Sequence, residues 1–149
     1  WTVLTFHHPI LSAAERRDNK ALRELWKPIF DKYNVDLILT GHDHTYGRSG
    51  LEAGEPNKKG GAVYVVSVSG SKMYNLQPQE WMRRKAEDSQ FYQIIRTDGS
   101  LLTYRAYTAD GVLYDAFDLQ KRSNGAKKLV NRIPGVPENL RSRASSVSQ

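Results

Sequence analysis

The sequence predicts an α/β fold in which antiparallel strands follow a parallel start. A short apolar strand, a helical pattern and a second apolar strand follow one another within the first 40 residues. This order implies a right-handed crossover between two parallel strands. Further along, Asp98-Gly99-Ser100 and Ala109-Asp110-Gly111 separate three strand-like runs. Such turn signals between alternating runs predict an antiparallel meander.

The crossover comprises three elements. Residues 2–6 form an apolar run that Pro9 follows, and proline cannot continue a central ladder. Residues 35–40 are mostly apolar and predict a buried strand. Between them, Pro28 predicts a kink or a fresh helix start within an otherwise helical run. The apolar residues of that run follow helical spacing: Leu22, Leu25, Trp26, Ile29, Phe30 and Tyr33.

The remaining elements follow from turn residues and apolar runs. Residues 45–61 are rich in glycine and predict a loop, whereas residues 62–69 predict a third strand. Residues 71–88 are expected to be irregular or partly helical, with Pro78 starting a short helix. The meander is expected to use residues 91–97, 101–108 and 112–119.

Composition limits the class of protein. The 149 residues suit about one domain, and the 39% hydrophobic and 26% charged fractions suit a soluble globular chain. No apolar run approaches the roughly 20 residues of a membrane span. Because the chain has no cysteine, any metal ligand must be a nitrogen or oxygen atom.

The net charge of +6 resides entirely in residues 121–149, which hold seven basic residues and one acid. We interpret this segment as a basic linker and the end of the sequence as an irregular tail. A nucleic-acid-binding arm is the alternative, but no aromatic residue is interleaved for base stacking, so nucleic acid is not an expected partner. The stretch Ile133-Pro134-Gly135-Val136-Pro137-Glu138-Asn139-Leu140 resembles the opening of a fibronectin type III domain, so a further module could follow.

All four histidines occur in two short patterns, Phe6-His7-His8-Pro9 and Gly41-His42-Asp43-His44. Each pattern follows a predicted strand, and the crossover should place the two strands side by side. In extended chain His42 and His44 would project to one side, so His7, His42 and His44 can converge. Imidazole binds transition metals well, which predicts a metal site on the rim of the sheet.

These patterns resemble a known family. His7-His8-Pro9 is similar to the H-x-P block, and Gly41-His42-Asp43-His44 to the G-H-x-H block, of calcineurin-like metallophosphoesterases, particularly the purple acid phosphatase-like members. The stretch before the second block, residues 33–40, and the closing hairpins are similar as well. The resemblance covers roughly residues 1–120, which it marks as the C-terminal part of a metallophosphoesterase domain.

The resemblance implies a four-layer α/β/β/α sandwich with mixed sheets and a binuclear centre of two divalent or trivalent ions (Fe, Zn or Mn). By motif position, His7 and His42 would bind the second metal and His44 the first. His8 would contact substrate or assist the leaving group. Tyr46 and Arg48 follow the motif closely, and we predict that they bind substrate, since arginine can bind phosphate bidentately. A surface or salt-bridged Arg48 is the alternative.

The implied activity is metal-assisted hydrolysis of a phosphoester, with a phosphomonoesterase expected and a phosphodiesterase as the alternative. The blocks that carry the family's bridging Asp and Asn ligands are absent from this sequence. We therefore expect half a site here, inactive alone, with the N-terminal half of the domain as a missing partner. A third possibility is a non-catalytic assembly unit, whose exposed first strand would favour an edge-paired or strand-swapped dimer. By analogy, the protein is expected to be secreted or periplasmic.

Overall fold

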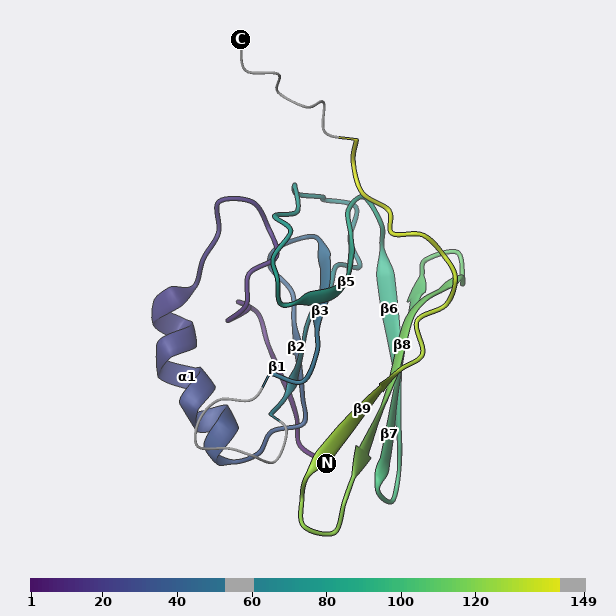
Figure 1. Cartoon of the computed structure of the whole chain (residues 1–149). Coiled ribbons are helices and arrows are strands. Elements are labelled where there is room, and N and C mark those ends of the chain that lie inside the picture. Colours follow the sequence, from purple (N-terminus) through teal and green to yellow (C-terminus); the bar gives the residue numbers. More distant parts are fainter. Residues whose placement is uncertain (53–60, 143–149) are drawn as a thin grey trace.

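The computed structural model describes residues 1–52 and 61–142, and Figure 1 shows its elements. The first part holds a strand, a helix and two more strands: β1 (Val3–Phe6), α1 (Lys20–Lys32), β2 (Leu37–Thr40) and β3 (Tyr46–Ser49). The second part contains only strands: β4 (Val63–Val66), β5 (Met82–Ala86), β6 (Phe91–Asp98), β7 (Leu101–Thr108), β8 (Leu113–Lys121) and β9 (Lys127–Asn131).

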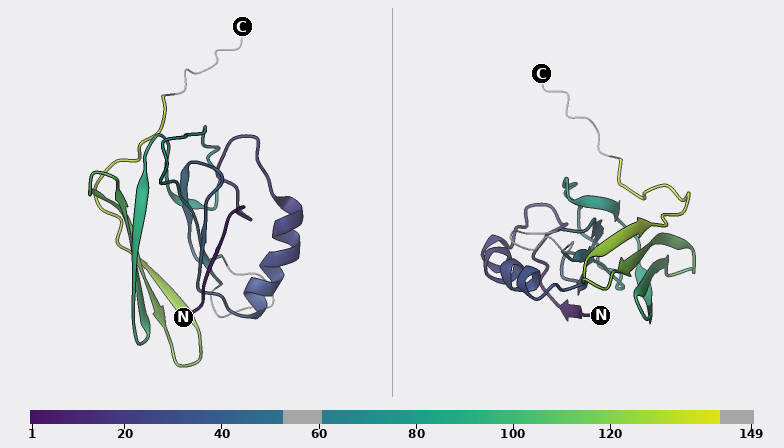
Figure 2. Two further views of the ribbon diagram at one scale, coloured as in Figure 1. Left: turned by 180° about the vertical axis from the view of Figure 1, so that it is seen from behind. Right: turned by 60° about the horizontal axis from the view of Figure 1, so that its bottom comes forward.

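The strands form two sheets that face each other, with α1 on the outer side of the first (Figures 1 and 2). The five-stranded sheet has the order β1-β2-β4-β3-β5, and the four-stranded sheet has the order β6-β7-β8-β9. Strands β1, β2 and β4 are parallel, whereas β3 and β5 add in antiparallel fashion. The predicted crossover and the mixed α/β class are therefore confirmed.

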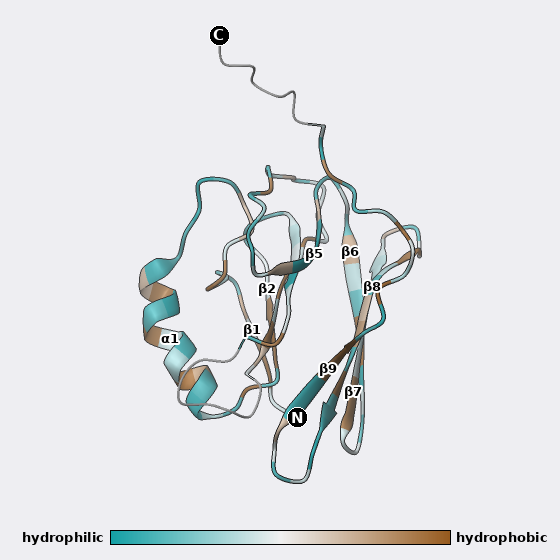
Figure 3. Ribbon diagram, viewed as in Figure 1, coloured by the Kyte–Doolittle hydropathy of each residue, from teal (hydrophilic) through white to brown (hydrophobic). Residues whose placement is uncertain are grey.

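Two apolar clusters hold these layers together. Helix α1 presents Trp26 and Phe30 to the first sheet, where they pack with Ile38 and Tyr64. Figure 3 shows hydrophilic and hydrophobic residues alternating along this helix, as an amphipathic surface helix requires. The larger cluster lies between the sheets and comprises Leu37, Tyr46, Val63, Val65, Ala86, Phe91, Leu102, Tyr104, Ala106, Tyr114, Phe117 and Leu119.

Two local predictions are wrong. Strand β3 lies in the stretch predicted to be a loop, and β5 lies where a short helix was expected after Pro78. Both strands are rich in polar and charged residues, so their sequences lack the apolar run on which the prediction relied. What forms these strands is backbone hydrogen bonding, because β3 pairs with both β4 and β5. Helix α1 passes through Pro28 as one element, so of the two alternatives predicted there the fresh helix start is excluded.

The prediction of an irregular basic tail from residue 121 is also wrong for residues 127–131, whereas residues 132–142 have no regular secondary structure. Strand β9 extends the second sheet by pairing with β8. Four of the seven basic residues of this segment pair with acids of the body: Lys121 and Lys127 with Asp36, Arg132 with Asp118, and Arg141 with Asp88. The positive charge therefore fastens the segment to the domain. Residues 143–149 lie outside the described residues, and the fibronectin-like module stays a prediction.

Within residues 1–52 and 61–142, the structure supplies a helical layer and two sheets. These are three of the four layers that the resemblance implies, and the fourth stays a prediction. No helix in these residues is long and apolar enough to cross a membrane.

Asp36 links the start of β1 to the C-terminal segment, and its replacement should destabilise the fold. Its buried carboxylate accepts a hydrogen bond from the backbone N–H of Thr2 (2.7 Å) and lies 2.8 Å from Lys121 Nζ and 3.2 Å from Lys127 Nζ. We expect Asp36→Asn to lower the free energy of unfolding at pH 7 by about 3 kcal/mol, because it leaves buried Lys127 without its counter-charge. Urea denaturation followed by circular dichroism measures this loss.

The loss should depend on pH with a definite sign. Burial alone would raise the pKa of Asp36, but the hydrogen bonds and charges of Lys121, Thr2 and Lys127 bring this pKa below its ordinary value. The stabilisation is therefore present above a pH of about 4 and is lost as the pH falls below it. Asp18→Asn, which removes an exposed partner of Arg23, is the control and should cost less than about 1 kcal/mol. A loss that does not change between pH 7 and pH 3 would argue against this pairing.

Candidate metal centre

The histidine patterns lie at one edge of the first sheet. His7 directly follows β1, and Gly41 to His44 directly follow β2. Because β1 and β2 are parallel neighbours, their carboxyl ends meet at the same edge. A hydrogen bond from Gly41 N–H to the His7 carbonyl oxygen (3.2 Å) joins the two patterns directly.

Three imidazoles gather at this edge. The possible ligand atoms of His7, His8 and His42 all lie within 4.8 Å of one another. His7 Nε2 and His42 Nδ1 are 3.0 Å apart. Two nitrogens that share one ion at about 2.0–2.1 Å in tetrahedral geometry lie about 3.3 Å from each other. The spacing of this pair therefore fits a single metal ion with little movement.

The convergence of His7 with His42 agrees with the sequence analysis, but the chain between His42 and His44 is not extended. Both residues have positive φ angles, 68° for His42 and 50° for His44. Such left-handed residues turn the chain, so the alternation of an extended strand does not apply. As a result, His42 joins His7 and His8, while His44 lies outside that three-residue cluster.

His44 instead faces the segment after β4. Its Nδ1–H donates to the carbonyl oxygen of Lys72 (2.8 Å), and its ring lies 4.7 Å from the ring of Tyr74. Tyr74 N–H also donates to the His44 carbonyl oxygen (3.3 Å). A bonded Nδ1–H leaves the lone pair on Nε2, which is the state that a neutral imidazole needs to bind a metal.

The protonation state of His42 also suits a metal ligand. Its pKa is lowered, first by burial and then by the nearby His8, Arg17 and His7, while Asp43 acts in the opposite direction. An imidazole binds metal only in its neutral form. His42 therefore stays in the binding form to a lower pH than an ordinary histidine does.

Asp43 does not join the imidazoles, although it lies between two of them in the sequence. Its side chain is fully buried and accepts hydrogen bonds from the N–H groups of Ala13 (2.6 Å) and Ala14 (3.2 Å). Within residues 1–52 and 61–142, the one group with metal-site spacing contains three histidines and no carboxylate. Neutral imidazoles alone cannot balance the charge of two ions, so these residues fit one ion and not a complete binuclear centre.

A cavity of about 560 Å³ opens beside His7. Residues from the ends of β1 and β2, the segment 67–69 and the start of β6 line it. Gln93 Nε2 donates to Ser67 Oγ (2.7 Å) across it, between the sheets.

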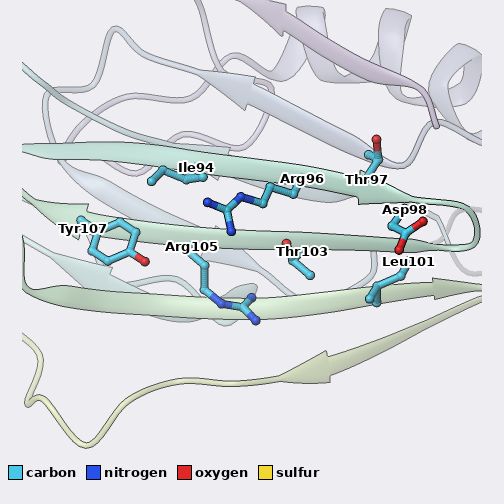
Figure 4. Close-up of a pocket in the computed structure, with 8 residues that line it drawn as sticks. All are labelled: Ile94, Arg96, Thr97, Asp98, Leu101, Thr103, Arg105 and Tyr107. Carbon is cyan, nitrogen blue, oxygen red and sulfur yellow. The ribbon is translucent and has the colours of Figure 1, made fainter.

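A second hollow, of about 410 Å³, lies on the outer face of β6 and β7 (Figure 4). There Arg105 is bound to Asp118 and to backbone carbonyls, and no histidine lines that surface.

The prediction that Tyr46 and Arg48 bind substrate is corrected by their positions. Both side chains are fully buried between the sheets. Arg48 Nε and Nη2 each lie 2.9 Å from an oxygen of Asp115, and Tyr46 donates its hydroxyl to Asp115 Oδ2 (2.8 Å). These two residues of β3 therefore join the first sheet to β8 in the second, and they are closed to a substrate.

Sequence reasoning missed three residues that border the histidines. The Arg17 guanidinium lies 4.7 Å from the centre of the Tyr74 ring, and Lys72 Nζ lies 5.1 Å from it. All three come from irregular segments, where no periodicity or motif marks a residue. The sequence marks them only as charged or aromatic residues in the segments that follow two strands: Arg17 after β1, and Lys72 and Tyr74 after β4.

Comparisons with known proteins agree with this fold. A purple acid phosphatase from yellow lupin seeds superimposes with a TM-score of 0.62 at 20% identity, over 85% of this chain and 26% of the lupin chain. Purple acid phosphatase 7 of Arabidopsis thaliana is 25% identical over 126 residues, which are 83% of this chain and 36% of that protein. An uncharacterized protein of Mycobacterium tuberculosis is 41% identical over 51 residues. No family model matches the chain.

The fold is thus that of a phosphatase-like α/β domain. More narrowly, the chain is similar to purple acid phosphatases over most of its length, which confirms the predicted resemblance. The chain spans only 10% to 36% of the length of the curated relatives that it matches.

Proposed function

We propose that this chain supplies His7, His42 and His44 to a binuclear metal centre that hydrolyses phosphomonoesters. The observation that carries the proposal is the 3.0 Å separation of His7 Nε2 and His42 Nδ1 at the carboxyl edge of two parallel strands. These two histidines would hold one ion. His44, whose Nδ1 is occupied by the Lys72 carbonyl, would present Nε2 to the other.

The bound ions, which we expect to be Fe, Zn or Mn, would activate water and neutralise the charge of the phosphoryl group. The chain's own residues have three further tasks. The left-handed turn at residues 42–44 leaves the His42 imidazole beside His7 and the His44 imidazole beside Lys72 and Tyr74. The bond to Lys72 fixes the tautomer of His44. His8 is exposed beside His42, with ring centres 4.0 Å apart, where it can donate a hydrogen bond to substrate or to the leaving group.

The proposal requires carboxylate ligands from beyond residues 1–52 and 61–142, because none of the carboxylates in those residues lies among the imidazoles. We therefore propose that the segment acts as half of a site, together with the preceding part of a four-layer domain. Alone, it should bind about one equivalent of metal and show little or no turnover.

Metal content and paired hydrolysis of p-nitrophenyl phosphate and bis-p-nitrophenyl phosphate test this proposal. They are measured on this chain and on a longer protein that carries it together with the preceding sequence. We expect two ions and faster monoester hydrolysis in the longer protein, and about one ion with little or no turnover in the chain alone. Faster diester hydrolysis would favour the phosphodiesterase alternative. A longer protein that binds no metal would refute the proposal.

The free edge of β1 supports a second role, in assembly. Within the described residues β1 pairs only with β2, so its other edge presents unpaired backbone groups. Such an edge is a template for another strand. We expect the isolated chain to form an edge-paired dimer, and light scattering across a range of concentrations measures its mass. A monomer at the highest concentration would count against this role.

A further inference from the structure

A group of side chains next to the histidine cluster has no part in the function proposed above. It is centred on the ring of Tyr74, which lies 4.7 Å from the ring of His44. Two cations contact the same ring: the guanidinium of Arg17 at 4.7 Å and Nζ of Lys72 at 5.1 Å. The ring therefore connects a histidine of the metal centre with two positive charges.

Arg17 is fixed to the histidine turn itself. Its Nη1 donates to the carbonyl oxygen of His42 (3.3 Å) and lies 3.5 Å from Asp43 Oδ1. The side chain is nevertheless 31% exposed. One side of the guanidinium is thus anchored to the protein, and the group still reaches solvent at the rim of the site.

Asp43 is the anchor. Its side chain is fully buried, with Oδ2 bound to the backbone N–H groups of Ala13 and Ala14 and Oδ1 facing Arg17. The Asp43 carboxylate therefore ties residues 13–17 to the turn that carries His42. No other ion pair to Asp43 occurs in the part of the chain that the structure describes.

The rim has an excess of positive charge. The Arg17 guanidinium and Lys72 Nζ lie 4.7 Å and 5.1 Å from the centre of the Tyr74 ring, so both positive charges border this side of the site. Lys72 forms no ion pair among residues 1–52 and 61–142. Two acids lie on this side: Asp43, which faces Arg17, and Glu15, which accepts a hydrogen bond from Asn75 Nδ2 (3.1 Å) and lies 4.0 Å from Arg16 Nε. An anion that reaches the histidines meets Arg17 and Lys72 at their border.

We propose that Arg17 binds the phosphoryl anion beside the metal centre and that Asp43 is the residue that positions it. A guanidinium matches two phosphate oxygens with parallel hydrogen bonds, which an ammonium group cannot do. The identity of the anion as substrate or product rests on the proposed function. The binding of the anion by Arg17 does not, because it needs no metal.

Isothermal titration of the metal-free chain with inorganic phosphate tests this inference. Arg17→Gln should weaken phosphate binding at least about tenfold, as the loss of a charge-assisted pair of hydrogen bonds predicts. Arg16→Gln is the matched control. Arg16 carries the same charge, precedes Arg17 directly in the sequence, and has a side chain that is 91% exposed. This control should change the affinity less than about twofold, since screened surface charge contributes little. Equal losses in the two variants, or no phosphate binding by the unmodified chain, would overturn the inference.

The role of Asp43 is tested by combining substitutions. Asp43→Asn should weaken phosphate binding in the unmodified chain but have no further effect in the Arg17→Gln variant, because it acts only through Arg17. Additive losses would show that Asp43 has a general structural role instead. Zinc titration of the same proteins separates the two proposals. Failure of zinc binding with intact Arg17-dependent phosphate binding rejects the metal centre alone, and the reverse result rejects this inference alone.

Discussion

Replacing His7 by alanine is expected to reduce the affinity of the chain for Zn²⁺ by at least about 100-fold. Loss of an outer partner of a metal ligand already costs 10- to 100-fold, and His7 would be a ligand itself. His7 is exposed at a strand end, so its removal should leave the fold intact. Isothermal titration with Zn²⁺ measures the affinity, and circular dichroism confirms that the variant is folded.

His44→Ala is the informative control for this experiment. His44 lies outside the cluster formed by His7, His8 and His42, and its ring packs against Tyr74. In the isolated chain, the single ion should be held by His7 and His42, so His44→Ala should change zinc affinity by only a few-fold. An affinity that stays within twofold of the unmodified chain in His7→Ala would contradict the assignment.

Replacing Asp115 by asparagine is expected to destabilise the fold by about 3–5 kcal/mol. Asp115 is fully buried, and its two oxygens accept hydrogen bonds from Arg48 Nε and Nη2 and from the Tyr46 hydroxyl. Burial alone would lower the pKa of Arg48, but Asp115 raises it, so the guanidinium keeps its charge. The substitution leaves that charge buried without its partner. Urea denaturation measures the loss.

Two further variants separate the charge from the packing. Asp110→Asn removes an exposed acid from a turn and should change the free energy of unfolding by less than about 0.5 kcal/mol. The double variant Arg48→Met with Asp115→Leu should recover most of the stability, since a buried ion pair can be replaced by apolar side chains of similar volume. A loss below 1 kcal/mol in Asp115→Asn would mean that the pair does not hold the sheets together.

The apolar part of the fold could be predicted from the sequence. Strands β1, β2, β4, β6, β7 and β8 and helix α1 all follow apolar runs, helical spacing or turn residues. Strands β3 and β5 could not be predicted in this way, because Arg48 and Arg84 sit at positions where a buried strand normally carries an apolar residue. Only the tertiary partners make these charges tolerable, such as Asp115 for Arg48. Strand β9 could not be predicted for a similar reason. Its lysines indicated a solvent-exposed segment, whereas the Lys127 side chain is buried against Asp36.

The site was predictable in its location but not in its detail. Histidines after two neighbouring parallel strands must meet at one edge, and His7 and His42 do. The separation of His44 depends on the left-handed backbone of His42 and His44, which spacing in the sequence does not reveal. The contact of Arg17 with the histidine turn depends on buried Asp43, which looks like an ordinary turn residue in the sequence.

The most direct test of the metal centre is a titration of the ¹⁵N-labelled chain with Zn²⁺, observed through the imidazole nitrogens by NMR. We predict that His7 Nε2 and His42 Nδ1 change together, saturate at one equivalent of zinc, and lose the contact that joins them at 3.0 Å in its absence. Imidazole signals that remain unchanged at one equivalent, or that change at His44 alone, would contradict the assignment of this edge of the sheet as a metal site.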